Sequence, residues 1–196
     1  QRFATARKAA EIAKTAWLQA HAASPNHPYL QRKQVLPHGL KQVRERLLVP
    51  LYRGNQLVSL QWIFPNGSKR FLSGGRLKGS FALVGPLTQQ APVFLCEGWA
   101  TGATLHEETG YPVVCAMNAG NLLPVGKQLQ AIWPDLQIIL AADDDRATEA
   151  AGKGNPGMQA AQRAAVHLGC QVVSPEFPAD APLELSDFND LAVWRA

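Results

Sequence analysis

The chain has 196 residues, of which 46% are hydrophobic, and this is enough for a buried core in one compact unit or two small ones. The composition excludes a disordered or fibrous chain, and no apolar run approaches the roughly 20 residues that span a bilayer. The net charge of +4 hides an asymmetry, because residues 1–90 hold 14 basic and two acidic residues, a charge of +12, whereas residues 91–196 hold 5 basic and 13 acidic ones, a charge of −8. Such a division indicates a polyanion bound by one part and cations bound by the other, or two surfaces of opposite sign that attract each other.

The start of the chain, QRFATARKAAEIAK, lacks the apolar core of a signal peptide, so we expect a cytoplasmic protein that contacts no membrane. The chain opens on Gln1 rather than on a methionine, and we expect it to be a piece of a longer polypeptide. Cys96, Cys115 and Cys170 lie in or beside apolar segments without C-x-x-C spacing. This placement favours buried, reduced thiols over a disulfide framework or a zinc site.

The first part of the chain predicts one helix and a small sheet. Phe3, Ala13 and Trp17 belong to an apolar stripe at helical spacing over residues 3–20, and the segment ASPNHP then ends the helix. Short apolar runs follow, separated by RGN and PNG, which are turn sequences typical of an antiparallel meander. We therefore predict that residues 1–90 form a small, basic α+β subdomain.

From Ala91 onward the pattern changes to strands that alternate with helices. Strands are expected in APVFLC, YPVVCAM, LQIILAA and CQVVSP, and helices over residues 100–109, 122–132 and 155–169. This order implies a mostly parallel sheet flanked by helices. Residues 91–196 are thus predicted to form one α/β domain of Rossmann-like architecture.

Acidic residues follow two of the predicted strands at the point where each strand ends. Glu97 comes directly after VFLC and before Gly98, and Asp143, Asp144 and Asp145 come directly after LQIILAA. Because the carboxyl ends of neighbouring parallel strands share one edge of the sheet, we expect Glu97 to meet the aspartates there. In extended geometry Asp143 and Asp145 point to one side and Asp144 to the other.

Grouped carboxylates repel one another unless a cation neutralises them, and their hard oxygen ligands suit Mg²⁺ or Mn²⁺. An isolated Glu-Gly is usually a turn, and an isolated D-x-D is usually a solvated loop or a helix cap. The combination on two strand ends of one parallel sheet is what indicates a metal site.

This combination resembles the Toprim domain, which primases, topoisomerases, nucleases of the overcoming-lysogenisation type and some recombination proteins share. The family pattern is a strand that ends in Glu-Gly and a later strand that ends in D-x-D, matched here by Glu97-Gly98 and by Asp143 and Asp145. The segments MNAGNL, GNPGMQAAQRAA and SDFNDL look like parts of plasmid and phage primases. Many Toprim domains carry an acid a few residues after Glu-Gly, whereas this chain has WATGATL there, which is closer to the plasmid and phage subgroup.

The resemblance implies the catalytic core of a DNA primase, in which a Toprim-like sheet is preceded by the basic subdomain and short RNA primers are made on single-stranded DNA. The catalytic residues that it implies are Glu97, Asp143 and Asp145, with the same three and Asp187 as ligands of Mg²⁺ or Mn²⁺. The nucleotide-binding residues are Asn118, Lys153 and Asp190. The nucleic-acid-binding residues are Arg46, Lys69, Arg70, Arg76 and Lys78. The implied partners are a single-stranded DNA template, ribonucleoside triphosphates and a replicative helicase, and the glycines at 152, 154 and 157 are expected to let the backbone approach phosphate.

Alternatives from other classes stay open at this point. A Toprim nuclease or a topoisomerase has the same kind of acidic site, although Tyr29, Tyr52 and Tyr111 lie in no context that suggests the nucleophilic tyrosine of a topoisomerase. A non-catalytic nucleic-acid-binding module is disfavoured by the complete set of acids. A phosphoacceptor receiver domain explains neither the Glu-Gly pair nor the basic subdomain.

Overall fold

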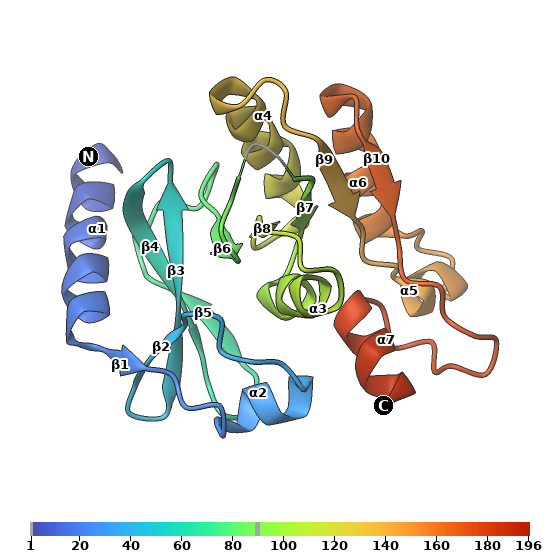
Figure 1. The fold of residues 1–196 in the computed structure, drawn as a ribbon, viewed down its shortest axis with the longest axis horizontal. Coiled ribbons are helices and arrows are strands. Elements are labelled where there is room, and N and C mark those ends of the chain that lie inside the picture. Colours follow the sequence, from blue (N-terminus) through green and yellow to red (C-terminus); the bar gives the residue numbers. More distant parts are fainter. Residues whose placement is uncertain (1, 89–90) are drawn as a thin grey trace. The chain divides into compact units, whose positions relative to one another are not determined.

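The computed structural model describes residues 2–88 and 91–196. The chain divides into two compact units, Gln1–Ala82 and Leu83–Ala196, and each unit is built on its own five-stranded sheet (Figure 1). The composition changes at residue 91, whereas the second compact unit begins earlier, because strand β6 (Ala82–Val84) joins the second sheet. The predicted boundary after residue 90 adjoins residues 89–90, which lie outside the described residues.

The first unit is a helix followed by an antiparallel meander. Its elements are α1 (Arg2–Gln19), β1 (His21–Ala22), α2 (Pro28–Lys33), β2 (Lys41–Val43), β3 (Arg46–Arg53), β4 (Gln56–Ile63) and β5 (Lys69–Phe71). The strands lie in the order β1-β2-β3-β4-β5, and each pair of neighbours is antiparallel. In the β3–β4 hairpin, Leu47 pairs with Ile63 and Arg53 pairs with Gln56, as the RGN turn sequence predicts.

The core of this unit lies between α1 and one face of the sheet. Ala13 of α1 is fully buried and packs in one cluster with Leu48 and Leu60 of the central hairpin. Trp17 and Trp62 are partly buried against this cluster. The alanines on the inner side of α1 allow the helix to approach the sheet closely, which leaves its basic residues on the outside.

The second unit has the predicted α/β organisation. Its elements are β6, β7 (Val93–Cys96), α3 (Trp99–Thr109), β8 (Val113–Cys115), the 3₁₀ helix η1 (Ala119–Asn121), α4 (Leu122–Ile132), β9 (Ile138–Ala141), α5 (Arg146–Ala150), α6 (Pro156–Leu168), β10 (Gln171–Val173) and α7 (Phe188–Arg195). The strands lie in the order β10-β9-β7-β8-β6, and the pairs β10/β9, β9/β7 and β7/β8 are parallel. The prediction of a mostly parallel sheet flanked by helices is therefore confirmed.

The central strands of this sheet are buried on both faces, which explains their continuous apolar sequences. Helix α3 packs onto them through Gly102, where an added Cβ would lie 2.4 Å from the Cys115 sulfur. Cys96 and Cys115 are register partners in β7 and β8 with their sulfur atoms 3.8 Å apart, and both are free thiols, as predicted. Within the described ranges we find no helix that combines the length and the apolarity needed to cross a membrane.

Candidate active site

Glu97 lies at the carboxyl end of β7, where the strand gives way to α3. Its backbone carbonyl accepts a hydrogen bond of 2.7 Å from the Met117 N–H, and the Cys96 carbonyl accepts one of 2.8 Å from the Ala116 N–H. These two bonds join the residues that follow β8 to the end of β7 and to Glu97. Met117 adopts a left-handed φ of 71°, which turns the chain away directly after the contact with Glu97. The half-buried Glu97 is therefore fixed at the edge of the sheet through its own backbone.

The three aspartates that follow β9 lie at the same edge, because Cys96 and Ala141 are register partners in the parallel β7/β9 pair. The extended geometry does not continue through them, since Asp145 is the N-cap of α5 with φ −74° and ψ 57°. Asp144 and Asp145 both bind the start of α6. The Asp144 carboxylate accepts a hydrogen bond of 2.7 Å from Asn155 Nδ2, and the Asp145 carboxylate accepts one of 2.7 Å from the Gly157 N–H.

Asp143 is the electrostatic centre of the site. Burial, followed by the negative charges of Asp187, Glu97, Asp145 and Asp190, raises the pKa of Asp143 from 3.8 to about 8. The other four acids that the sequence selected therefore all act on Asp143 at this edge of the sheet. Four of these five acids were expected as metal ligands, and the fifth, Asp190, was expected to bind nucleotide.

These acids suit a divalent cation, although the structure does not arrange them as a closed cage. Among the residues that the structure describes, no group of three or more His, Cys, Asp or Glu side chains stands ready to hold a metal ion. The Asp143 Oδ1 atom is nevertheless buried without a hydrogen-bond partner in the described part of the chain, and its neighbours are carboxylates. A cation would satisfy this oxygen and neutralise the repulsion. Mg²⁺ and Mn²⁺ favour such oxygen ligands, and Mg²⁺ commonly completes its shell with water and substrate phosphate.

The SDFNDL segment has a structural task besides any binding task. Asp187 is the N-cap of α7 and accepts a hydrogen bond of 2.7 Å from the Asp190 N–H, while the Asp190 carboxylate accepts one of 3.1 Å from the Ser186 N–H. This reciprocal arrangement is close to a capping box. The Ser186 carbonyl also accepts a 2.7 Å hydrogen bond from the Asp144 N–H, which joins the segment to the D-x-D loop. One oxygen of Asp187 and one of Asp190 are thus already used by the backbone.

Asn118 and Lys153 lie in loops of the second unit. Asn118 precedes η1, and its carbonyl accepts a hydrogen bond of 3.1 Å from the Asn121 N–H. Lys153 is exposed in the turn after α5, and within the described ranges no ion pair links it to the acids. Their predicted contact with a nucleotide stays a prediction.

The three glycines near Lys153 have local structural reasons. Gly152 and Gly154 adopt left-handed φ values of 73° and 75°, which L-residues with a side chain rarely adopt. At Gly157 an added Cβ would lie 2.8 Å from the Asp143 carbonyl oxygen and 3.1 Å from the Asp143 Cβ. Gly157 thus lets the start of α6 approach the D-x-D loop, and the expected approach to phosphate stays a prediction.

In the first unit, predicted nucleic-acid-binding residues are stacked on aromatic rings. The Arg46 guanidinium lies 5.1 Å from the Trp62 ring centroid, and the Arg70 guanidinium lies 5.9 Å from that of Phe64. Lys69 lies in the same way over a tyrosine ring on α2, at 5.7 Å. Tyr29 is buried, so only the partly exposed Trp62 and Phe64 rings could stack on bases, and contact of these cations with nucleic acid stays a prediction.

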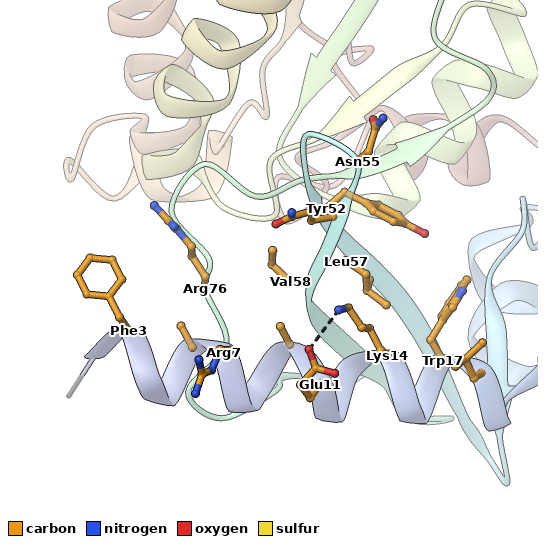
Figure 2. A pocket seen from close by; sticks show the side chains of 14 residues that line it. Phe3, Arg7, Glu11, Lys14, Trp17, Tyr52, Asn55, Leu57, Val58 and Arg76 are labelled. Atoms are coloured by element: carbon orange, nitrogen blue, oxygen red, sulfur yellow. Dashed lines mark hydrogen bonds and ion pairs between the residues drawn. The ribbon is translucent and has the colours of Figure 1, made fainter.

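Arg76 lines a groove of about 700 Å³ between α1 and the β3–β4 hairpin (Figure 2). Arg7 and Lys14 line it from α1, with Lys14 paired to Glu11 at 3.1 Å. Phe3, also on α1, is 87% exposed beside it. The sequence does not predict this groove, because its walls come from segments about 40 residues apart that the helical pattern alone does not bring together.

Carboxylates at the ends of β7 and β9 of a parallel sheet define the Toprim class of domain, and residues 92–195 match the family model described as a Toprim domain. The chain belongs to the Toprim family, and the predicted family resemblance is confirmed. It is similar to two Escherichia coli proteins named DNA primase TraC, with 34% identity over 157 residues (76% of this chain) and 35% identity over 172 residues (84% of this chain). The chain spans 15% and 12% of the lengths of these relatives.

Two solved structures share the fold. One is the DnaG primase catalytic domain bound to single-stranded DNA, with a TM-score of 0.57 and 14% identity over 99% of this chain and 75% of that one. The other is the DnaG catalytic core, with a TM-score of 0.54 and 14% identity over 100% of this chain and 76% of that one. The predicted fold class, a Toprim-like sheet preceded by a small α+β subdomain, is confirmed.

Proposed function

We propose that this chain is the catalytic core of a DNA primase, which joins ribonucleotides into short RNA primers on a single-stranded DNA template. The observation that carries the proposal is the set of carboxylates around Asp143 at the edge of a Toprim sheet. Sequence similarity to proteins named DNA primase supports primer synthesis over the other activities of Toprim domains. We place the protein in the cytoplasm, where nucleotide substrates and a replicative helicase are available to it.

In the proposed reaction a 3′-hydroxyl attacks the α-phosphate of a ribonucleoside triphosphate, a phosphodiester bond forms and pyrophosphate leaves. Glu97, Asp143, Asp145 and Asp187 would hold Mg²⁺ or Mn²⁺, which would supply the positive charge that such a transfer requires. Glu97 acts as a ligand or as the base that accepts the hydroxyl proton. The raised pKa of Asp143 means that this side chain becomes a full anionic ligand when a cation is present to stabilise the charge.

The nucleotide is bound, in this proposal, by Asn118, Lys153 and Asp190 in the loops around the acids. The template is bound by the first unit through Arg46, Lys69, Arg70, Arg76 and Lys78. The groove beside Arg76 offers further cations on α1. These contacts are electrostatic, so the affinity for a template should depend strongly on salt and weakly on sequence.

The experiment is template-dependent incorporation of a labelled ribonucleotide by the 196-residue chain, with Mg²⁺, with Mn²⁺ and with EDTA. We expect incorporation with either cation and none with EDTA. Glu97→Gln should lower the rate by about 10²-fold or more, because the acid that binds a cation or accepts a proton is lost. The same substitution should leave the melting temperature equal or slightly higher, since it removes one repulsive charge beside Asp143.

A matched control is Gln171→Glu, the reverse exchange of amide and carboxylate at an exposed position of β10 in the same unit. A destabilised Glu97→Gln chain that retains incorporation would contradict the proposal, because Glu97 would then be a structural turn residue. Shortening of a labelled strand in the same reactions, without incorporation, would instead support a Toprim nuclease.

A further inference from the structure

Asn155 joins the start of α6 to the D-x-D loop through four hydrogen bonds. Its side-chain oxygen accepts bonds from the N–H groups of Met158, at 3.3 Å, and Asp145, at 3.0 Å. Its Nδ2 donates to the carboxylates of Asp144, at 2.7 Å, and Glu149, at 3.4 Å. Two N–H donors face the oxygen and two carboxylates face the amide nitrogen, so the orientation of the amide follows from its partners. With 7% of its surface exposed, Asn155 is one of the few buried polar residues of the second unit.

Capping of α6 needs one of these four bonds. The bond to Met158 is the ordinary N-cap contact of an asparagine. The other three lead away from α6, to the backbone of Asp145, to the side chain of Asp144 and to Glu149 on α5. Asn155 is therefore bonded to the acidic loop more extensively than a cap requires.

The position of Asn155 in the chain explains the arrangement. Residues 146–154 leave the D-x-D loop as α5 and a glycine-containing turn, and the chain returns at Asn155. The Asn155 side chain joins the two ends of this segment, because it binds Asp144 and Asp145 directly before it. The start of α6 then holds Asp145 at two points, because Asn155 binds its backbone N–H and the Gly157 N–H binds its carboxylate.

We propose that Asn155 is a positioning residue that fixes the Asp145 carboxylate for cation binding. This inference rests on the proposed function, since it concerns the same cation. Asn155 acts through Asp145 and Asp144 and does not itself contact the reacting atoms. In metal sites, groups that orient the ligands change metal affinity by about 10- to 100-fold when they are replaced.

Asn155→Asp separates positioning from capping. Aspartate is as good an N-cap as asparagine, so α6 should keep its cap. The substitution removes the Nδ2 donor and places a carboxylate against those of Asp144 and Glu149, which should push the loop away. Added negative charge alone should tighten Mn²⁺ binding. We expect the opposite, a loss of about 10-fold or more in Mn²⁺ affinity, measured by calorimetry with a non-hydrolysable ribonucleoside triphosphate present.

The second variant tests whether the lost hydrogen bond is the cause. Asp144→Asn combined with Asn155→Asp exchanges donor and acceptor, keeps the net charge of the wild type and allows the bond to form in the reverse direction. We expect Mn²⁺ affinity within a few-fold of the wild type. Asp144→Asn alone keeps an acceptor for Asn155 and should bind Mn²⁺ as the wild type does. Gln171→Glu, at an exposed position of β10, serves as the distant control.

Hydrogen exchange of the peptide that covers residues 143–158, measured without metal, supplies a readout that is independent of the cation. Exchange should increase in Asn155→Asp and return to the wild-type rate in the double variant. Unchanged exchange, or wild-type Mn²⁺ affinity in Asn155→Asp, would overturn the positioning role and leave the proposed function standing. If the wild type itself binds no Mn²⁺ with nucleotide, the cation assignment fails and with it the role of Asn155, even where the exchange result shows that the bond exists.

Discussion

A carboxyl group with a buried oxygen among other carboxylates opposes folding, and the half-buried Asp143 is in this position. Its pKa of about 8 means that near neutral pH the folded chain holds a proton on this group that the unfolded chain releases. Burial and the charges of four neighbouring acids all raise this pKa. Strongly shifted carboxyl groups in such surroundings are more common at functional sites than elsewhere, because a bound ion or substrate offsets the repulsion.

The first prediction concerns the pH dependence of stability in metal-free buffer. The folded pKa of Asp143 lies above the unfolded value of 3.8, so the folded chain binds this proton more tightly than the unfolded chain does. The contribution of Asp143 to the free energy of unfolding is therefore fully present below about pH 4 and is lost as the pH rises to about 8. Asp143→Asn removes this titration. The free energy of unfolding, measured with urea, should rise in the variant relative to the wild type by at most about 1.4 kcal/mol per pH unit within that window. At pH 8 the difference should reach a few kcal/mol, as an order of magnitude.

Mn²⁺ provides the control for this prediction. It should raise the stability of the wild type at pH 8 and leave Asp143→Asn nearly unchanged, because the variant lacks the anionic ligand. Unfolding free energies of the two proteins that run parallel from pH 5 to pH 8 would show that Asp143 does not carry a raised pKa.

Glu97 and the D-x-D acids could be predicted from the sequence because each group follows a buried strand, whereas Asp187 and Asp190 were predicted only from the family resemblance. Glu97 and Asp143 are the first charged residues after apolar runs, and parallel strands place such positions at one edge. Asn155 was missed, although an asparagine before a proline at a helix start is a capping signal. Its other partners lie up to eleven residues earlier in the chain, across α5, and sequence spacing does not predict that this segment folds back.

At the scale of elements, α7 shows how one segment serves two purposes. The helix begins at a capping pair, Asp187 and Asp190, and the buried Asn189 donates a 2.9 Å hydrogen bond to Thr104 Oγ1 on α3. The cap therefore holds the negative charge of Asp187 close to Asp143 while α3 holds the helix in place. A cap of this kind does not need a charge, because asparagine caps a helix as well as aspartate does.

The second prediction uses this difference to separate the two roles of Asp187. Asp187→Asn keeps the cap and should leave the melting temperature equal or slightly higher, whereas Asp187→Ala loses the cap and should cost about 1 kcal/mol of stability. If Asp187 is also a metal ligand, both variants should lose Mn²⁺ affinity and primer synthesis to a similar degree, as calorimetry and the incorporation assay would measure. Full activity in Asp187→Asn together with reduced stability in Asp187→Ala would mean that Asp187 is a cap alone.

Elements that carry a clear apolar pattern were predicted well, and elements without one were not. The helices α1, α4 and α6 carry an apolar pattern at helical spacing, and the strands β7 and β9 are continuous apolar runs. Helix α5 has five residues and none of them is buried, so it has no amphipathic pattern. Strand β6 has three residues and is defined by its pairing with β8, which is a tertiary contact.

At the scale of the whole molecule, the division of charge follows the division into compact units closely. The basic residues of the first unit include those stacked on aromatic rings, and the acids of the second unit include those gathered at the sheet edge. The alternation of strands and helices was sufficient to predict the class of fold. The position of the unit boundary was less accessible, because β6 precedes the change in composition and belongs to the second sheet.

The third prediction tests whether the basic unit binds the phosphate backbone of single-stranded DNA. Each phosphate contact releases counterions, so the logarithm of affinity should fall with the logarithm of salt by about 0.7 per contact. Replacing Lys69, Arg70 and Lys78 by glutamine should therefore reduce the slope by about 2, as fluorescence anisotropy with a labelled oligonucleotide would show between low and physiological salt.

The matched control replaces three exposed cations of the second unit, Lys127, Arg163 and Arg195, by glutamine and changes the net charge equally. If net charge alone governs binding, both triple variants should lose slope to the same extent, and the basic unit would then have no special role as the template surface. If the first variant alone flattens the salt dependence, the phosphates lie along β5 and the loop that follows it.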